Sequence, residues 1–297
     1  MKKLIIVTIF ISLSFFTQAK SLKIASWNIA WLSSHEYNNR VDADYKQLAM
    51  YASKLDADVI ALQEVEDGEW ARKVFGDDYD YYFSTKDWVQ KVGIAIRKSS
   101  GFKVTSREYK ALDVGRVRHG MDIMLTKDDK QLRLLGIHLK SGCFDKPLDN
   151  LSVNSMPEAT ERNIKEKDAC TILSNQIKPL EAWIDQRASE GIPFMILGDF
   201  NRRFSIDIEK AHKENQGLWQ AIDDEGNESL WTPTLTKNSK CWGGYYKDYI
   251  DHIVLDPKAK SKFINGSFEQ LVFDGKYSRE LSNALSDHCP ISVELNL

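Results

Sequence analysis

The stretch PFMILGDFNRR (residues 193–203) changes character halfway along its length. Its first five residues are apolar and suit a strand that is buried on both faces of a sheet. A glycine, the carboxylate of Asp199, the amide of Asn201 and two arginines then follow at once. A buried strand that ends in such groups predicts a polar site at the end of that strand.

Similar apolar runs recur along the chain and predict further strands. They lie at residues 22–28, 59–65, 92–96, 122–125, 132–139, 193–199, 249–255 and 291–295. Helical spacing predicts a helix that begins at Asp42 or Asp44 and a longer one at residues 159–188, which Pro179 would kink. The polar segments 140–158 and 227–247 are predicted loops. This mixture predicts an α/β domain of packed sheets with helices outside.

Polar side chains stand at the ends of these predicted strands, one segment after another. They are Asn28, Glu64, His138, Asp199 with Asn201, Asp251, and Asp287 with His288. One such residue is easily explained as a turn former, but six segments with the same arrangement predict a shared site. Carboxylate and amide oxygens are the ligands that Mg²⁺ prefers. We therefore expect a divalent-metal site for Mg²⁺, with Mn²⁺ or Ca²⁺ as alternatives.

The two histidines of this set suit acid–base work or the stabilisation of negative charge. Asp251 would orient His288 and favour its cationic form, because a carboxylate fixes the tautomer of a neighbouring imidazole. A Lewis acid, a base and cations together are what the hydrolysis of a phosphate ester requires. The residues themselves thus indicate a phosphoester hydrolase.

The ordered segments WN, QE, GDFN and SDH resemble the endonuclease/exonuclease/phosphatase superfamily, the DNase-I-like fold, over nearly the whole mature chain. The run HLKSGC also resembles a segment of secreted bacterial nucleases. The resemblance implies a four-layer α/β/β/α sandwich, in which two packed mixed β-sheets carry helices on their outer faces.

The resemblance also implies which residues bind the metal and the water. Glu64 is the implied principal metal ligand, with Asn28 and Asp287 close by. Asp199 would orient or deprotonate the attacking water, and Asn201 would hold that water or a phosphate oxygen.

For the phosphate, the resemblance implies a second group of residues. His288, paired with Asp251, would stabilise the scissile phosphate, and His138 would protonate the leaving group. Arg118, or in second place Arg116, would reach the phosphate as a substrate-binding residue.

Other residues near these motifs have simpler interpretations. Trp242 is the best candidate for stacking on a base. Arg202 and Arg203 suit a solvated face better than a substrate clamp. Successive strand residues face opposite sides, so His252 should face the packing side if its neighbour Asp251 faces the site.

Four cysteines are present, namely Cys143, Cys170, Cys241 and Cys289. They show no CxxC or Cys-His spacing, which argues against zinc. An even number in an exported chain predicts two disulfides, although four cysteines allow three pairings. We favour Cys143 with Cys170 and Cys241 with Cys289, because each bridge would close a loop beside a motif.

The first nineteen residues differ from the rest of the chain. Two lysines precede an apolar run at residues 4–16 and a small residue at Ala19, which is the pattern of a secretory signal peptide. A buried first strand or a membrane anchor is the alternative, but thirteen residues are short for a bilayer. We expect residues 1–19 to be a signal peptide and residues 20–297 to be one domain, periplasmic or secreted.

Composition limits the function further. The chain is 42% hydrophobic with a formal charge of −3, and loss of Lys2 and Lys3 makes it more negative. Such a charge argues against a broad basic surface that contacts many phosphates, although a local basic rim is compatible with it. We expect a monomer without stable membrane association.

The expected activity is that of an exported, metal-dependent phosphodiesterase, most simply a nuclease of low sequence specificity acting on DNA or RNA. A phospholipase C or sphingomyelinase would need an apolar docking loop, whereas segment 140–158 is mostly polar. An inositol-phosphate phosphatase would need clustered lysines. A non-catalytic binding protein on this fold would normally lack part of the ligand set, which is complete here. Apurinic-site endonucleases often carry an acidic residue where this chain has Ala30, which weakens that assignment.

Overall fold

The computed structural model describes residues 21–35, 37, 39–210, 216–223 and 229–297. The predicted signal peptide lies outside these residues, so its assignment stays a prediction. In the described ranges, no helix is both long enough and apolar enough to span a membrane.

The strands of the described chain form two mixed sheets. The first has the order β10-β11-β1-β2-β4-β3 and contains β1 (Leu22–Leu32), β2 (Val59–Val65), β3 (Tyr79–Phe83), β4 (Lys91–Arg97), β10 (Glu269–Gln270) and β11 (Ile291–Leu295). The second has the order β5-β6-β7-β8-β9 and contains β5 (Lys103–Tyr109), β6 (Gly120–Lys127), β7 (Lys130–His138), β8 (Phe194–Asp199) and β9 (Asp251–Leu255). The pairs β1–β2 and β7–β8 are parallel.

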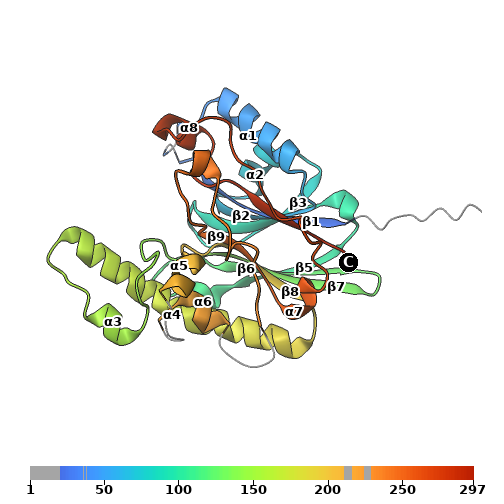
Figure 1. Cartoon of the computed structure of the whole chain (residues 1–297). Helices are drawn as coiled ribbons and strands as arrows, with labels where there is room; N and C mark the ends of the chain where they lie inside the picture. The colour runs from blue at the N-terminus through green and yellow to red at the C-terminus, as the bar shows by residue number, and fades with distance from the viewer. Residues whose placement is uncertain (1–20, 36, 38, 211–215, 224–228) are drawn as a thin grey trace, which may run out of the picture.

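Helices cover the outer faces of both sheets, as Figure 1 shows. On the side of the first sheet lie α1 (Asp42–Leu55), α2 (Gly68–Phe75) and α8 (Arg279–Ala284). On the side of the second lie α3 (Asn150–Asn154), α4 (Glu161–Glu190), α5 (Phe204–Glu209), α6 (Leu218–Ile222) and α7 (Pro257–Lys260). The described chain also contains the 3₁₀ segments η1 (Lys98–Ser100), η2 (Lys110–Leu112) and η3 (Cys241–Gly244). The predicted four-layer sandwich is confirmed.

Strand β2 shows how the sequence produces the layers. Val59 and Ala61 belong to the core between the two sheets, whereas Ile60 and Leu62 belong to the core under α1. The strand is therefore buried on both faces, which explains its nearly continuous apolar sequence. Burial of each large aliphatic side chain of this kind stabilises the fold by about 1.5–3 kcal/mol.

The flanking helices are amphipathic and have defined starts. In α1, the carboxylate of Asp44 accepts a hydrogen bond from the backbone N–H of Val41 at 2.9 Å, and Leu48 and Leu55 are buried against the first sheet. In α4, Thr160 Oγ1 accepts the N–H of Asn163 at 3.2 Å and caps the first turn. The helices thus begin at capping groups, and their apolar stripes close the outer cores.

The eight predicted strands are present, with ends that differ by a few residues. Strands β3, β5 and β10 were not predicted. β5 is largely exposed and β10 has two residues, so neither carries a long apolar run, and β3 is a half-buried strand at the edge of its sheet. The predicted loop at 140–158 contains the short helix α3.

Candidate active site

Three neighbouring strands of the second sheet bring one site residue each to the same edge. His138 at the end of β7 is paired with Asp199 at the end of β8, which is paired in turn with Asp251 at the start of β9. The residue before Asp199 must be glycine, because Gly198 has φ 149° and a Cβ there would lie 2.0 Å from the carbonyl oxygen of Ile137. Three functional groups therefore stand in a row across this sheet.

Two bulges in the first sheet direct further side chains to the same place. The pairing of β1 with β2 shifts after Asn28, and that of β2 with β4 shifts at Glu64, which has φ 60°. A bulge re-aims side chains, and here the amide nitrogen of Asn28 lies 3.1 Å from Asp199 Oδ2 and 3.4 Å from Glu64 Oε1. Its oxygen accepts the N–H of Ala30. In this orientation the amide nitrogen of Asn28 faces the two carboxylates, and its oxygen faces the backbone of Ala30.

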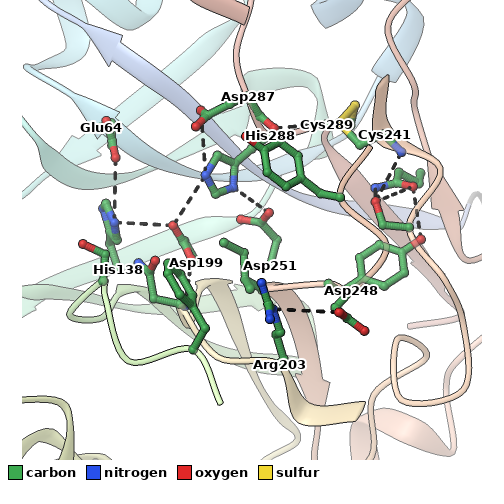
Figure 2. Close-up of a pocket in the computed structure, with 18 of the residues that line it drawn as sticks. Glu64, His138, Asp199, Arg203, Cys241, Asp248, Asp251, Asp287, His288 and Cys289 are labelled. Carbon is green, nitrogen blue, oxygen red and sulfur yellow. Dashed lines mark hydrogen bonds and ion pairs between the residues drawn. A yellow bond between two sulfur atoms is a disulfide. The ribbon is translucent and has the colours of Figure 1, made fainter. Parts of the chain in front are cut away.

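Asp199 is the centre of the cluster and is 2% exposed. Its Oδ2 lies 3.5 Å from His138 Nε2 and 3.9 Å from His288 Nε2, and its Oδ1 accepts the N–H of Asn201 at 2.8 Å. Figure 2 shows Asp199 between the two imidazoles. Burial raises the pKa of Asp199 to about 7, against the opposing effect of His288. Such a carboxyl exchanges protons near neutral pH.

His288 is held by Asp251 and by the loop that carries it. Its Nδ1 lies 2.7 Å from Asp251 Oδ2, and its backbone N–H donates to Ser286 Oγ at 2.9 Å. Ser286 in turn donates to the carbonyl of Asn28 at 2.7 Å. Burial alone would lower the pKa of His288, but the carboxylates of Asp251, Asp287 and Asp199 outweigh it and raise that pKa well above its usual value. These carboxylates therefore favour the cationic form of His288.

His138 has the opposite character. It is 3% exposed, and burial together with the positive charges of Arg118 and His288 holds its pKa well below the usual value. Its Nε2 lies 3.9 Å from Glu64 Oε1 as well as near Asp199. One neutral and one cationic imidazole thus stand on either side of Asp199.

Five carboxylates line the cleft above this cluster, which has a volume of about 680 Å³. They are those of Glu64, Asp199, Asp248, Asp251 and Asp287. Asp287 lies at the rim, with its side chain 49% exposed and Oδ1 3.8 Å from His288 Nε2. Asp199, Asp251 and His288 also bring possible ligand atoms within 4.8 Å of one another, and His288 would have to release its proton to bind a metal there.

Of the two arginines considered for the phosphate, Arg118 lines the cleft. Its Nη2 donates to Gln90 Oε1 at 2.9 Å, and burial lowers its pKa although Glu64 and Asp199 act in the other direction. Arg116 is exposed, with φ 61°, and is not among the residues of the cleft wall. Gln90 was not predicted, because its role depends on a neighbour 28 positions away.

Trp242 does not face the cleft as a base-stacking residue should. It is 2% exposed, its Nε1 donates to the carbonyl of Ser286 at 3.0 Å, and its ring packs 5.2 Å from that of Phe273. Its interpretation as a substrate-binding residue is therefore wrong. The exposed aromatic residues of this loop that line the cleft are Tyr245 and Tyr246. The sequence GGYY directly after Trp242 is the signal that could have found them.

Arg202 and Arg203 differ from each other. Arg202 is wholly buried and forms a bidentate pair with Asp207, with Nε 2.9 Å and 3.1 Å from the two carboxylate oxygens. Its assignment to a solvated face was wrong. Arg203 is partly exposed on the cleft wall, 3.8 Å from Asp248 and over the ring of Phe144.

His252 faces the packing side, as predicted. Its ring is stacked 3.9 Å from that of Phe204, Nδ1 lies 2.6 Å from Thr234 Oγ1, and Nε2 donates to the carbonyl of Arg202 at 2.8 Å. Burial lowers its pKa from 6.5 to about 3. It is a neutral structural residue under the site.

Both predicted disulfides are present. Cys143 is bonded to Cys170, and Cys241 is bonded to Cys289. Figure 2 shows the second bridge beside His288, the residue that directly precedes Cys289. This bridge joins the loop of residues 241–250 to the C-terminal segment that carries His288.

Comparison with known proteins places the chain in a family. Residues 25–288 match the model of the Endonuclease/Exonuclease/phosphatase family. Similar solved structures include an endonuclease/exonuclease/phosphatase from Bacteroides vulgatus (14% identity, TM-score 0.59, covering 94% of this chain and 99% of that one). The human Nocturnin catalytic domain is also similar, with 13% identity, a TM-score of 0.54, and coverage of 93% of this chain and 94% of that one. So is D. rerio TDP2 with a single-strand DNA product, with 19% identity, a TM-score of 0.52, and coverage of 93% of this chain and 99% of that one. A search of curated protein sequences found no match. The chain belongs to the endonuclease/exonuclease/phosphatase family, whose members hydrolyse phosphoester bonds.

Proposed function

We propose that this protein is an exported, divalent-metal-dependent phosphodiesterase, a nuclease of low sequence specificity. The observation that carries the proposal is the set of contacts around the buried Asp199, with a cationic His288 and a neutral His138 on either side. This combination supplies a base, a positive charge and a hydrogen-bond donor within one small volume. Phosphodiester hydrolysis needs all three.

We propose that Glu64, Asn28 and Asp287 hold a divalent cation, Mg²⁺ or alternatively Mn²⁺ or Ca²⁺. The donor chemistry fits, because carboxylate oxygens suit hard cations and the carboxylates of Glu64 and Asp287 both line this cleft. When bound, the cation supplies Lewis-acid polarisation of the phosphate ester.

Asp199 is the proposed base for the attacking water. A pKa of about 7 suits a group that must accept a proton near neutral pH. The side-chain amide of Asn201 donates to the carbonyl of Leu139 at 3.1 Å, which leaves its oxygen available to hold the water or a phosphate oxygen. Asn201 lines the cleft and has φ 52°, a left-handed conformation that asparagine adopts more readily than most residues.

His288 and Arg118 are the proposed partners of the phosphate. Both are positive groups lining the cleft, and Asp251 keeps His288 cationic. His138 is the proposed leaving-group acid. Its pKa is low in the free protein, so it would take up its proton when the anionic phosphate binds, because a nearby negative charge favours the imidazolium.

Two further observations support a nucleic-acid substrate and export. A structurally similar D. rerio TDP2 was solved with a single-strand DNA product. Phosphate contacts carry no sequence information, so a site built around the phosphate favours low specificity. The two disulfides are typical of proteins in oxidising compartments.

The test is a substrate panel for the purified mature protein: plasmid DNA, single-stranded DNA, RNA, sphingomyelin vesicles and an inositol phosphate, each with Mg²⁺ and with EDTA. The proposal expects cleavage of nucleic acid that EDTA abolishes and added Mg²⁺ restores. Faster hydrolysis of the lipid or of the phosphomonoester would contradict it.

A further inference from the structure

Three tyrosines form a cluster beside the cleft, which we call the tyrosine platform (Tyr245, Tyr246 and Tyr277). Tyr245 and Tyr246 line the cleft, and Tyr277 packs against both of them. The rings of Tyr245 and Tyr277 are stacked at 4.1 Å with planes 9° apart, and the ring of Tyr246 stands edge-on to both, at 4.8 Å and 5.7 Å. Aromatic groups packed in this way present a flat, ordered surface.

The platform is exposed although its residues are large and aromatic. Tyr245 is 61% exposed and Tyr246 is 40% exposed, and both line the same cleft as His288 and Asp287. Tyr277 covers one face of the Tyr245 ring. An aromatic side chain that is held in place but left uncovered beside a catalytic centre is suited to a planar ligand.

The backbone that presents the platform is strained and firmly supported. Trp242, Gly243 and Gly244 have φ values of 51°, 68° and 81°, three left-handed residues in succession. For a tryptophan this conformation costs about 1 kcal/mol or more, and such strain persists only where the surroundings hold it. The support comes from the core, because the buried ring of Trp242 packs against Phe273 and Tyr277.

The platform is also linked to the phosphate site. The Cys241–Cys289 disulfide, with 5.5 Å between the Cα atoms, ties the start of the tyrosine loop to the residue after His288. Tyr246 and Asp287 line the same cleft. Arg203 and Lys247 line the same wall and supply positive charge for a phosphate backbone.

We propose that the tyrosine platform binds an unpaired nucleobase of the nucleotide next to the scissile phosphate, so that the enzyme acts on single-stranded nucleic acid in preference to duplex. This inference rests on the proposed nuclease function and adds the class of substrate. Bases of every kind stack on aromatic side chains, which agrees with low sequence specificity. A duplex hides both faces of each base, and unstacking one costs free energy that a single strand does not require.

The test uses two dinucleotides, thymidylyl-thymidine and the same phosphodiester without its bases, together with a single-stranded oligonucleotide and its duplex. Tyr245→Leu and Tyr246→Leu should raise KM for thymidylyl-thymidine by roughly 5- to 100-fold, the equivalent of about 1–3 kcal/mol per stacked base at about 1.4 kcal/mol per tenfold. The loss should be confined to the substrate that has bases, and kcat should change little. The wild type should cleave the single strand at least about tenfold faster than the duplex.

Two controls make the result specific. Tyr245→Phe keeps the ring and should have the wild-type KM. If the hydroxyl group bound the substrate, this variant would instead have a raised KM. Tyr37→Leu removes a tyrosine of similar exposure, 59%, which stacks on Trp31 and is not among the residues that line the cleft. This variant should have the wild-type KM for both dinucleotides.

Several outcomes would overturn the inference. They are an unchanged KM in both leucine variants, an equal loss with the base-free dinucleotide, an equal loss in Tyr37→Leu, or duplex cleavage as fast as that of the single strand. A wild-type protein that cleaves no diester at all would instead overturn the proposed function itself.

Discussion

Asp251 Oδ2 and His288 Nδ1 lie 2.7 Å apart, although 37 residues separate them in the sequence. The opposite nitrogen of the imidazole, Nε2, lies 3.9 Å from Asp199. The carboxylate therefore determines both the orientation and the charge of the group that we propose to face the phosphate. These two residues should act as one unit.

Asp251→Asn tests this unit, because it keeps the size of the side chain and removes its charge. The pKa of His288 should fall toward its usual value, and kcat should fall by about 10²-fold, the usual effect of a positioned electrostatic group. The double variant with His288→Ala should be scarcely worse than His288→Ala alone, since residues that act together are not additive. Steady-state kinetics of the four proteins measure the coupling. Losses that multiply independently would separate the two residues.

Glu64→Gln tests the proposed metal site. The amide is a weaker ligand than the carboxylate, so we expect a large fall in kcat/KM and a shift of the Mg²⁺ dependence to higher concentration. Magnesium titration of the activity, together with calorimetric titration of Mg²⁺ into each protein, measures both effects. A variant with wild-type turnover at low Mg²⁺ would remove Glu64 from the site.

The two disulfides should differ in what they do for catalysis. Their loops of 27 and 48 residues predict a similar loss of stability on removal, about 4 kcal/mol each in the entropic model. Removal of Cys241–Cys289 should in addition lower kcat/KM by at least about tenfold under conditions where the protein stays folded, because a small misplacement of catalytic groups is costly. Paired alanine variants, compared by activity and by denaturant unfolding, provide the measurement. Equal activity in both would show that the second bridge is only structural.

His252 should affect the pH dependence of the free energy of unfolding, and it should have little effect on turnover. Its pKa is about 3 in the folded protein and 6.5 as the ordinary value, so between these values the unfolded state binds a proton that the folded state does not. The free energy of unfolding therefore falls as the pH is lowered through this window, by about 1.4 kcal/mol per pH unit from this group.

His252→Asn removes that contribution. Its unfolding free energy should fall less steeply than that of the wild type between pH 6.5 and pH 4.5, by about 2–3 kcal/mol over the interval. Urea unfolding at several pH values measures the difference, and turnover should change little. Identical slopes would mean that His252 is already protonated in the fold, and loss of turnover would place it in the site.

Much of this site could be read from the sequence, because its residues directly follow apolar strands. Asp199 and His138 end buried strands whose register aligns them, and the alternation of strand residues separated Asp251 from His252 correctly. The QE motif, and not the alternation of side chains along a strand, predicted that Glu64 belongs to the site. It occupies a bulge with φ 60°, and a bulge breaks the rule that decides which side a residue faces.

The incorrect predictions concern residues in loops, because an irregular segment has no periodicity that would predict which of its side chains face the core. Trp242 and Tyr245 lie three residues apart in one aromatic loop, yet one is 2% exposed and the other 61%. Arg202 and Arg203 are adjacent, yet only Arg202 is buried against Asp207. Contacts with residues far away in the sequence decide these cases.

We propose that Asp199 acts on the water in phosphodiester hydrolysis, and Asp199→Asn removes the carboxylate that this role requires. The measurement is the initial rate of cleavage of single-stranded DNA at saturating Mg²⁺, with His252→Asn as the folded control and melting curves for all proteins. We expect Asp199→Asn to fold normally and to lose about 10²–10⁴-fold in kcat. A folded Asp199→Asn protein that cleaves within tenfold of the wild-type rate would contradict the account.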